Sequence, residues 1–325
     1  MGDSPAGGMT SRSLRSLVGY SPIVDRPPIS WPQGRPLAVW VVLNVEHYEF
    51  MPPPEIGRTT WDRVPMAPDV REYSFRDHGN RVGLWRTLEV FDRYGIRPTL
   101  SLNLAVMDLF PRIRQEIVDR DLCVMSHGIF NTRYLFGLSP EDERAFYRDN
   151  IETLRRHTGR ELRGVLTPAV SNTVETPHLM AEAGLRYHAD WVHDDQPVPL
   201  LIDGWRDGRR LISMPYSYDL NDAPLWDGRP YSGDYLVDSV AEQTDRLLVD
   251  AARYGTGFVL CVALHPYQIG LPQHIGRLER MLERLSGDDR LWIADGDDIA
   301  NHYLDHHYDR HVAHLLETGA VDHAR

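Results

Sequence analysis

The chain has 325 residues, of which 42% are hydrophobic and 25% charged, as expected for an ordinary globular protein with one large domain. Its formal net charge of −12 argues against nucleic acid or an anionic membrane as a partner. The sequence contains no lysine, which excludes Schiff-base lysine catalysis and a lysine-dependent phosphate loop. No apolar run of about 18 residues predicts a membrane-spanning helix.

The cysteine content and the N-terminal residues bear on the cellular compartment. Cys123 and Cys261 both fall inside predicted core strands and are interpreted as small buried hydrophobic residues rather than as a disulfide. Residues 1–26 contain no apolar core of signal-peptide length. We therefore expect a cytoplasmic protein that acts on a small metabolite.

The first third of the chain combines polar segments with strong apolar patterns. Residues 1–34 are rich in Ser, Gly and Pro and predict a partly flexible N-terminal arm. Residues 36–43 form a near-continuous apolar run, typical of a parallel strand buried on both faces. A long Pro-rich loop is expected from residue 46 to about residue 80, a length usually associated with function. Helix 81–94 and strand 97–102 follow.

Strands and helices alternate through the rest of the chain, which predicts a single α/β domain over 35–304 with a mostly parallel sheet. Strands are predicted at 122–127, 164–167, 185–189, 258–265 and 291–294, helices at 108–119, 139–157, 174–183, 237–254, 273–285 and from 297, and a hairpin pairs 200–202 with 210–214. About seven strand–helix units favour a distorted (β/α)7 barrel. Residues 305–325 are expected to form a solvated peripheral tail.

Three potentially reactive side chains stand at the ends of predicted strands. His127 and His265 each end a short apolar strand and precede Gly or Pro, and Glu46 follows the first strand. Because strand side chains alternate between faces, Asn44 and Glu46 share a face. The carboxyl ends of parallel strands meet at one rim, where sites are built. We expect Glu46, His127 and His265 to face one cavity and to perform acid–base or metal chemistry.

These residues, in this order, resemble the polysaccharide deacetylase superfamily, which has the NodB-like fold. In that superfamily the first strand ends in a catalytic base and a metal-binding Asp, a His-x-x-x-His motif completes the metal site, and a late Leu-His-Pro supplies the general acid. Here Asn44 stands at the position of the base and Glu46 at that of the metal-binding Asp. His127 matches the first metal histidine, Asn131 replaces the second, and His265 matches the acid.

The resemblance covers residues 36–302 and points to one branch of the superfamily. Asn-x-Glu on the first strand, together with segments 77–85, 214–222 and 264–272, is similar to the branch of PuuE-type allantoinases and related cyclic-amide hydrolases. The resemblance implies that such proteins work without the usual metal. The cofactor stays open between none and a weakly held divalent metal, such as zinc, on Glu46 and His127.

The resemblance and the residues together predict a hydrolase of a non-peptide carbon–nitrogen bond, an amide in a small and possibly cyclic metabolite. Glu46 and His127 would handle the attacking water, and His265 would protonate the leaving nitrogen. Asp222 would either orient a histidine or bind N–H groups of the substrate. Arg81 would clamp a carboxylate or imide oxygen. The residues expected to bind substrate are Asn44, Arg81, Asn131, Trp191, Asp195 and Tyr216.

Two other functions stay open from the sequence. One is a metal-dependent N-deacetylase of a sugar or small amine, and the other is a catalytically inactive barrel that binds a ligand. In each case the partner is expected to be a small molecule, with neither nucleic acid nor membrane involved. We also expect a homo-oligomer, because the Pro-rich arm is suited to packing on a neighbouring subunit.

Overall fold

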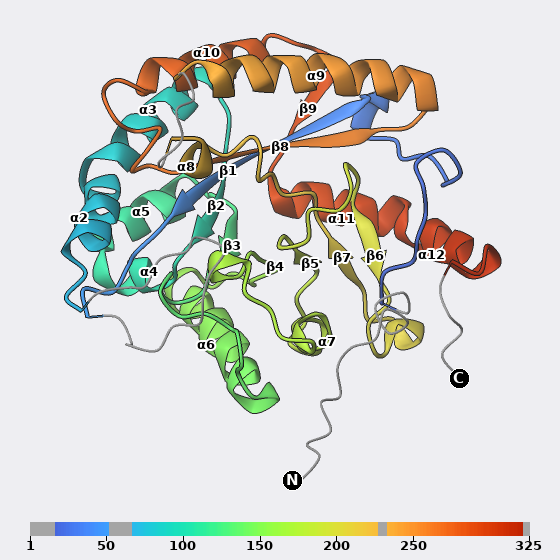
Figure 1. Ribbon diagram of the computed structural model, residues 1–325, viewed down its shortest axis with the longest axis horizontal. Helices are drawn as coiled ribbons and strands as arrows, with labels where there is room; N and C mark the ends of the chain where they lie inside the picture. Colours follow the sequence, from blue (N-terminus) through green and yellow to red (C-terminus); the bar gives the residue numbers. More distant parts are fainter. Residues whose placement is uncertain (1–16, 52–66, 227–232, 321–325) are drawn as a thin grey trace, which may run out of the picture.

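A curled, mostly parallel sheet organises the chain (Figure 1). The computed structural model describes residues 17–51, 67–226 and 233–320. The strand order is β6-β7-β5-β4-β3-β2-β1-β8, with β9 also paired to β1, and β6 is antiparallel to β7. The strands are β1 (Leu37–Val45), β2 (Thr99–Leu102), β3 (Val124–Ser126), β4 (Gly164–Val165), β5 (Tyr187–His188), β6 (Val198–Leu200), β7 (Leu211–Ser213), β8 (Phe258–Leu264) and β9 (Leu291–Ile293).

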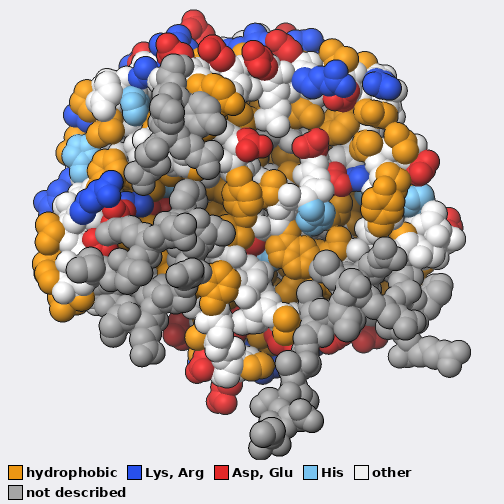
Figure 2. Space-filling model, viewed as in Figure 1, with side chains coloured by type: hydrophobic (Ala, Val, Ile, Leu, Met, Phe, Trp, Pro, Cys, Tyr) orange, Lys and Arg blue, Asp and Glu red, His pale blue; other side chains and the backbone are white. Residues whose placement is uncertain are grey.

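Helices cover the outer face of this sheet (Figure 1). They are α2 (Val70–His78), α3 (Leu84–Tyr94), α4 (Ala105–Leu109), α5 (Pro111–Asp119), α6 (Pro140–Thr158), α7 (Thr176–Glu182), α8 (Asp222–Trp226), α9 (Tyr235–Tyr254), α10 (Ile275–Ser286), α11 (Gly296–His306) and α12 (Tyr308–Glu317), with short turns η1 (Pro32–Gly34), η2 (Gly79–Gly83), η3 (Pro168–Val170) and η4 (Trp205–Asp207). Figure 2 shows charged side chains gathered over α9 and α10, with hydrophobic side chains toward the middle of the same face. None of the helices in the described ranges is long and apolar enough to span a bilayer.

The predicted distorted (β/α)7 barrel is confirmed. Strands β7, β5, β4, β3, β2, β1 and β8 form a run of seven parallel strands. Beyond β7, Asn221 forms an isolated parallel bridge with Ala263 of β8, which brings the two edges of the run together. The hairpin predicted between 200–202 and 210–214 corresponds to β6 and β7.

Strand β1 lies at the centre of the fold. All nine of its residues are buried, as the continuous apolar run predicted. Its first half pairs with both β8 and β9, and Val42–Val45 pairs with β2. Every residue of β1 is thus paired on at least one side, and the pairing with β2 continues to its carboxyl end, which fixes the direction of the residues there.

The prediction of a long loop from residue 46 to residue 80 is wrong in its second half. Asp69 accepts a hydrogen bond from the Glu72 N–H and starts α2, which continues through the π-helical turn η2 into α3. A Cβ on Gly83 would lie 2.0 Å from the Pro266 carbonyl oxygen, so glycine allows η2 to pack closely on the segment after β8. Residues 52–66 of the expected loop lie outside the described residues.

The expected solvated tail is also wrong over the range of α12. Tyr308, Val312 and Leu315 lie on one face of this helix and are buried in the core. The many His and Asp residues of this segment hide that pattern in the sequence. Residues 321–325 of the expected tail lie outside the described residues.

The described part of the N-terminal arm is packed rather than loose. Leu17, Ile29 and Trp31 are buried, and the Trp31 indole N–H donates to the Phe258 carbonyl oxygen at 2.8 Å. The arm also contacts α12, since His311 Nε2 lies 2.9 Å from the Pro27 carbonyl oxygen. Residues 1–16 of the arm lie outside the described residues.

Acid is predicted to destabilise the contact between the arm and α12. His311 Nε2 faces a carbonyl, so it carries the proton, and Nδ1 accepts from the Tyr303 hydroxyl at 2.7 Å. Burial lowers the pKa of His311 from 6.5 to about 4. Between these values the unfolded chain binds a proton that the folded chain excludes, so stability falls as the pH falls from 6.5 to 4. At about 1.4 kcal/mol per pKa unit, the loss is on the order of 3 kcal/mol.

The variant His311→Gln isolates this effect, because glutamine can make both hydrogen bonds without titrating. Urea unfolding at pH 7 and pH 4.5 should show a smaller loss of stability for the variant than for the natural protein. Equal losses would show that His311 does not cause the acid sensitivity.

Candidate functional site

A cavity of about 310 Å³ opens at the carboxyl ends of the parallel strands. Its walls come from the ends of β1, β3, β4, β7 and β8 and from α2. Among the lining residues are Asn44, Glu46, Tyr48, Arg76, His127, Asn131, Tyr134, Leu166, Ala169, Val170, Tyr216, Tyr218, His265 and Tyr267. The cavity therefore brings together the strand-end residues that the sequence placed at one rim.

The carboxylate of Glu46 lies at the centre of the polar groups in this cavity. Its Oε1 is 3.5 Å from His265 Nε2 and 3.8 Å from His127 Nε2, and its Oε2 is 3.4 Å from Arg76 Nε. Burial opposes ionisation, but His265, Arg76 and His127 together outweigh it and lower the pKa of Glu46 to about 2. Glu46 is therefore a buried carboxylate that stays ionised at neutral pH.

His265 lies between two carboxylates. Its Nδ1 is 2.7 Å from Asp222 Oδ1, and its Nε2 faces Glu46. Asp222 is fully buried at the start of α8 and is itself held by the backbone N–H groups of His265 and Ile269. Burial disfavours the imidazolium, but Asp222 and Glu46 raise the pKa of His265 to about 9. His265 is therefore protonated at neutral pH.

His127 has the opposite character. Its Nδ1 lies 2.9 Å from the Leu166 carbonyl oxygen, and a carbonyl only accepts, so Nδ1 carries the proton. Burial lowers the pKa of His127, although Glu46 partly opposes this effect. A neutral His127 presents the unprotonated Nε2 toward Glu46. One histidine of the cavity can thus accept a proton while the other can donate one.

Arg76 is the main site residue that sequence reasoning missed. It comes from α2 and is 8% exposed, and its guanidinium lies between the rings of Tyr48 and Tyr267, 4.3 and 4.4 Å from their centroids. It donates to Glu46 and to Glu72 one turn earlier. The spacing of Glu72 and Arg76 would have signalled a helical ion pair, had the segment not been assigned to a loop.

The two asparagines expected to bind substrate both line the cavity. Asn44 Nδ2 donates to the Leu264 carbonyl oxygen at 3.2 Å and to the Tyr216 hydroxyl at 3.0 Å, and Asn131 Nδ2 donates to the Tyr48 hydroxyl at 3.1 Å. The side-chain oxygens of Asn44 and Asn131 are buried and accept no hydrogen bond from the described residues. These oxygens are available to N–H groups of a ligand.

Three other residues expected to bind substrate do not reach the cavity. Arg81 extends from η2 into solvent and pairs with Asp77. The Asp195 carbonyl oxygen accepts from the N–H of Val259, which lies at the amino end of β8, opposite the cavity. Trp191 lies against a separate cavity, with its ring 5.9 Å from that of His188. Trp191 and Asp195 follow β5 but lie away from the cavity, and Arg81 lies within a helical stretch with its side chain exposed.

The residues present fit a divalent metal poorly. Glu46 and His127 face each other, but the described ranges contain no group of three or more His, Cys, Asp or Glu side chains arranged to hold a metal ion. A metal on Glu46 would also lie beside the guanidinium of Arg76 and the imidazolium of His265, which repel another cation. We derive no catalytic step through a metal.

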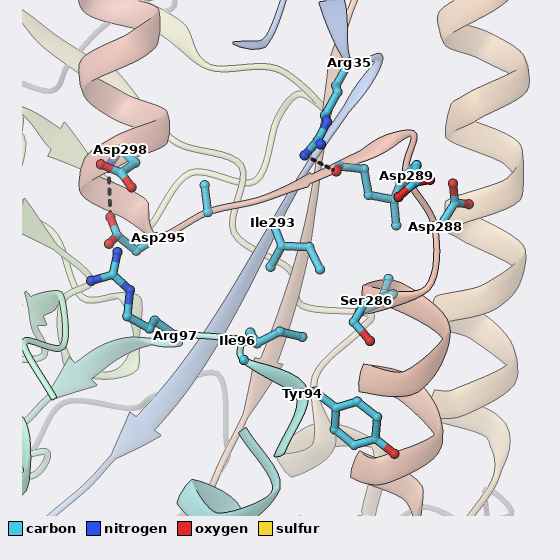
Figure 3. Close-up of a pocket in the computed structure, with 14 residues that line it drawn as sticks. Arg35, Tyr94, Ile96, Arg97, Ser286, Asp288, Asp289, Ile293, Asp295 and Asp298 are labelled. Atoms are coloured by element: carbon cyan, nitrogen blue, oxygen red, sulfur yellow. Dashed lines mark hydrogen bonds between the residues drawn. The ribbon is translucent and has the colours of Figure 1, made fainter. Parts of the chain in front are cut away.

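A second cavity of about 430 Å³ lies at the amino ends of β1, β2 and β9 (Figure 3). Its charged side chains are largely engaged with the protein: Arg35 donates to the Leu291 carbonyl oxygen at 2.9 Å, and Asp295 accepts from the Asp298 N–H at 2.9 Å. No histidine lines it. This cavity therefore lacks the pair of histidines with opposite protonation that the other rim holds.

Arg76 and Arg81 make a matched pair for testing the site. We expect Arg76→Met to lower the free energy of unfolding by about 3–5 kcal/mol, because it removes the buried cation between the buried carboxylates of Glu46 and Glu72. Arg81→Met, on the same helical stretch but exposed, should leave the free energy of unfolding nearly unchanged. Urea unfolding measures both variants, and similar values for the two would contradict this account.

The fold is shared with solved structures of known proteins. No family model matches the chain. A candidate polysaccharide deacetylase of Schizosaccharomyces pombe is 23% identical over 322 residues, covering 88% of this chain and 95% of that protein. A candidate polysaccharide deacetylase from Pseudomonas aeruginosa PAO1 and PuuE allantoinase each superpose with a TM-score of 0.77 at 23% identity, covering 87% of this chain and 96% and 95% of theirs. The chain thus has the barrel fold of these proteins, which confirms at the level of the fold the resemblance predicted from its motifs.

Proposed function

We propose that the protein hydrolyses a non-peptide carbon–nitrogen bond, an amide in a small and possibly cyclic molecule. The observation that carries the proposal is the array of Asp222, His265 and Glu46, with a neutral His127 beside it in one buried cavity. The names of the structural relatives, which include a deacetylase and an allantoinase, support the same reaction class.

In this proposal, His127 and Glu46 activate the attacking water. Their facing atoms are 3.8 Å apart, close enough for one water to bridge them. With a pKa of about 2, Glu46 is a weak base, so it orients the water and stabilises positive charge on His127. The unprotonated Nε2 of His127 then accepts the proton as the water oxygen attacks the amide carbon.

In this proposal, His265 protonates the leaving nitrogen. The attack forms a tetrahedral intermediate with negative charge on oxygen, which the positive charges of His265 and Arg76 favour. His265 Nε2 donates its proton to the leaving nitrogen, the carbon–nitrogen bond breaks, and Asp222 holds the imidazole in place throughout. The described lining contains no cysteine or serine nucleophile, which favours direct attack by water.

The shape and polarity of the cavity favour a small substrate with N–H groups. Its volume of about 310 Å³ suits a compact molecule, and five tyrosines line it: Tyr48, Tyr134, Tyr216, Tyr218 and Tyr267. The acceptor oxygens of Asn44 and Asn131 would each be left buried and unpaired by a substrate without N–H or O–H donors. A ring amide meets these requirements.

Assembly of the protein into a homo-oligomer stays a prediction.

Activity should depend on pH through His265. Because its pKa is raised to about 9 and the reaction needs its proton, kcat/KM is expected to fall as the pH rises through about 9. Asp222→Asn removes a charge that favours the imidazolium, so the falling limb should move to lower pH and kcat should drop by about 10²-fold or more. The matched control is Asp219→Asn, an exposed residue near the end of the same segment. A limb that stays in place in Asp222→Asn would contradict the role of His265.

A substrate screen tests the function directly. Purified protein is incubated with hydantoins, imides, allantoin and N-acetyl compounds, and products are detected by mass. We expect turnover of a ring amide that survives removal of divalent metals with EDTA, because Arg76 and His265 already supply positive charge beside Glu46.

Other outcomes of the screen separate the remaining functions. Deacetylation that is lost with EDTA and restored by zinc would favour the metal-dependent N-deacetylase. Binding of panel compounds without any turnover would favour the inactive barrel and overturn the proposal.

A further inference from the structure

One wall of the cavity has an unusual backbone. Ala169 and Val170, in the segment that follows β4, have φ angles of 52° and 55° and both line the cavity. This left-handed conformation disfavours residues with a Cβ, and most of all a β-branched residue such as Val170. A conformation of this kind persists only where surrounding contacts impose it, and it is frequent at ligand sites.

Asp190 provides the contacts that hold this segment at both ends. It follows β5 and is 3% exposed. One carboxylate oxygen accepts from the Thr167 N–H at 2.7 Å. The other accepts from the Thr167 hydroxyl at 2.6 Å, from the Asn172 amide at 2.6 Å and from His188 Nε2 at 2.8 Å. A single carboxylate thus ties together the residues immediately before and after the left-handed turn.

The neighbouring strands do not need Asp190 to stay paired. Strands β4 and β5 are joined by their own backbone ladder, including the Ala189 N–H to the Val165 carbonyl oxygen at 2.9 Å. Leu166, whose carbonyl holds His127, is fixed by its N–H to the Ser126 carbonyl oxygen at 2.9 Å. The strand frame is therefore independent of the Asp190 carboxylate, whereas the segment 167–172 is not. The Leu166 carbonyl that holds His127 belongs to the same peptide unit as the Thr167 N–H, so Asp190 also helps to hold that carbonyl.

We propose that Asp190 is a positioning residue of the site: it holds segment 167–172 in the left-handed conformation that forms the substrate-facing wall. Only the effect of Asp190 on catalysis rests on the proposed hydrolase function; its hold on segment 167–172 does not. Asp190 also reaches the neighbouring wall, because its carbonyl oxygen accepts from the hydroxyl of Tyr218, another lining residue, at 2.9 Å. It touches neither the cavity nor the reacting atoms.

The test compares Asp190→Asn with Glu143→Gln. Glu143 is also a fully buried carboxylate, and it accepts hydrogen bonds from Tyr147, Thr173 and Thr176 at 2.6–2.8 Å, all of which lie outside segment 167–172. It therefore reproduces the loss of a buried acceptor without releasing the wall. Two readouts are measured: amide hydrogen exchange over residues 169–171, and kcat and KM on the best substrate from the screen.

In Asp190→Asn we expect exchange at residues 169–171 to be at least tenfold faster, with β4 and β5 unchanged. KM should rise at least tenfold while kcat stays within about threefold. The side-chain oxygen that remains in this variant can still accept from the Thr167 N–H, which shares a peptide unit with the carbonyl that holds His127. Glu143→Gln should leave both the exchange at 169–171 and KM unchanged. A merely structural role for Asp190 would make the two variants alike.

Several outcomes would overturn the inference. Unchanged exchange at residues 169–171 in Asp190→Asn would show that the carboxylate does not hold the segment. Faster exchange with unchanged KM would show that the segment does not position substrate. If Asp190→Asn fails to fold, Asn172→Leu removes one anchor and leaves the carboxylate three partners, and the same two results decide the question. If no panel compound is hydrolysed, the proposed function fails, while the exchange experiment still decides whether Asp190 holds the wall.

Discussion

The structure of the site depends on one buried negative charge, that of Glu46. In a low-dielectric interior a lone carboxylate would take up a proton, but here two cationic groups and a neutral imidazole surround it. Each of these partners is in turn held by another group: Arg76 by Glu72, His265 by Asp222, and His127 by a backbone carbonyl. The site is thus a series of buried groups, each stabilised by its neighbour. Removal of any one of them leaves the next group without that stabilising contact.

The fold supplies this arrangement by bringing rigid elements to one point. Strand β1 is paired along its whole length and carries Asn44 and Glu46 at its end. The ends of β3 and β8, which lie on either side of β1 and β2 in the sheet, carry His127 and His265. A helix from outside the sheet contributes Arg76. Three of the four charged or titratable groups around the Glu46 carboxylate, counting Glu46 itself, therefore come from strand ends.

The sequence predicted what depends on local pattern. The apolar run of β1, the strands that end at His127 and His265, and the capped start of α6 at Ser139 are all visible as spacing and composition. Which histidine donates the proton and which accepts it is harder to predict from the sequence. The answer depends on the group to which Nδ1 of each ring is hydrogen-bonded. For His265 that partner is the carboxylate of Asp222, and for His127 it is a carbonyl from β4.

The sequence failed where a helix is hidden by its composition. Segment 70–78 has few apolar residues, because its buried face carries Glu72 and Arg76, so its pattern resembles that of a polar loop. In α2 these polar side chains take the place of apolar ones in the interior by pairing with each other, and single-residue hydrophobicity does not register such pairs. In α12 the buried face is mostly apolar, but the His and Asp residues between its members obscure the pattern.

The glycine contact between η2 and the segment after β8 limits how the protein can adapt to a ligand. Gly83 and Gly270 bring two backbones together, with no side chain between them that could yield. The helix that carries Arg76 and the turn that follows His265 are consequently joined as one rigid block. Among the described residues that line the cavity, this block is therefore the part least able to move apart when a molecule binds.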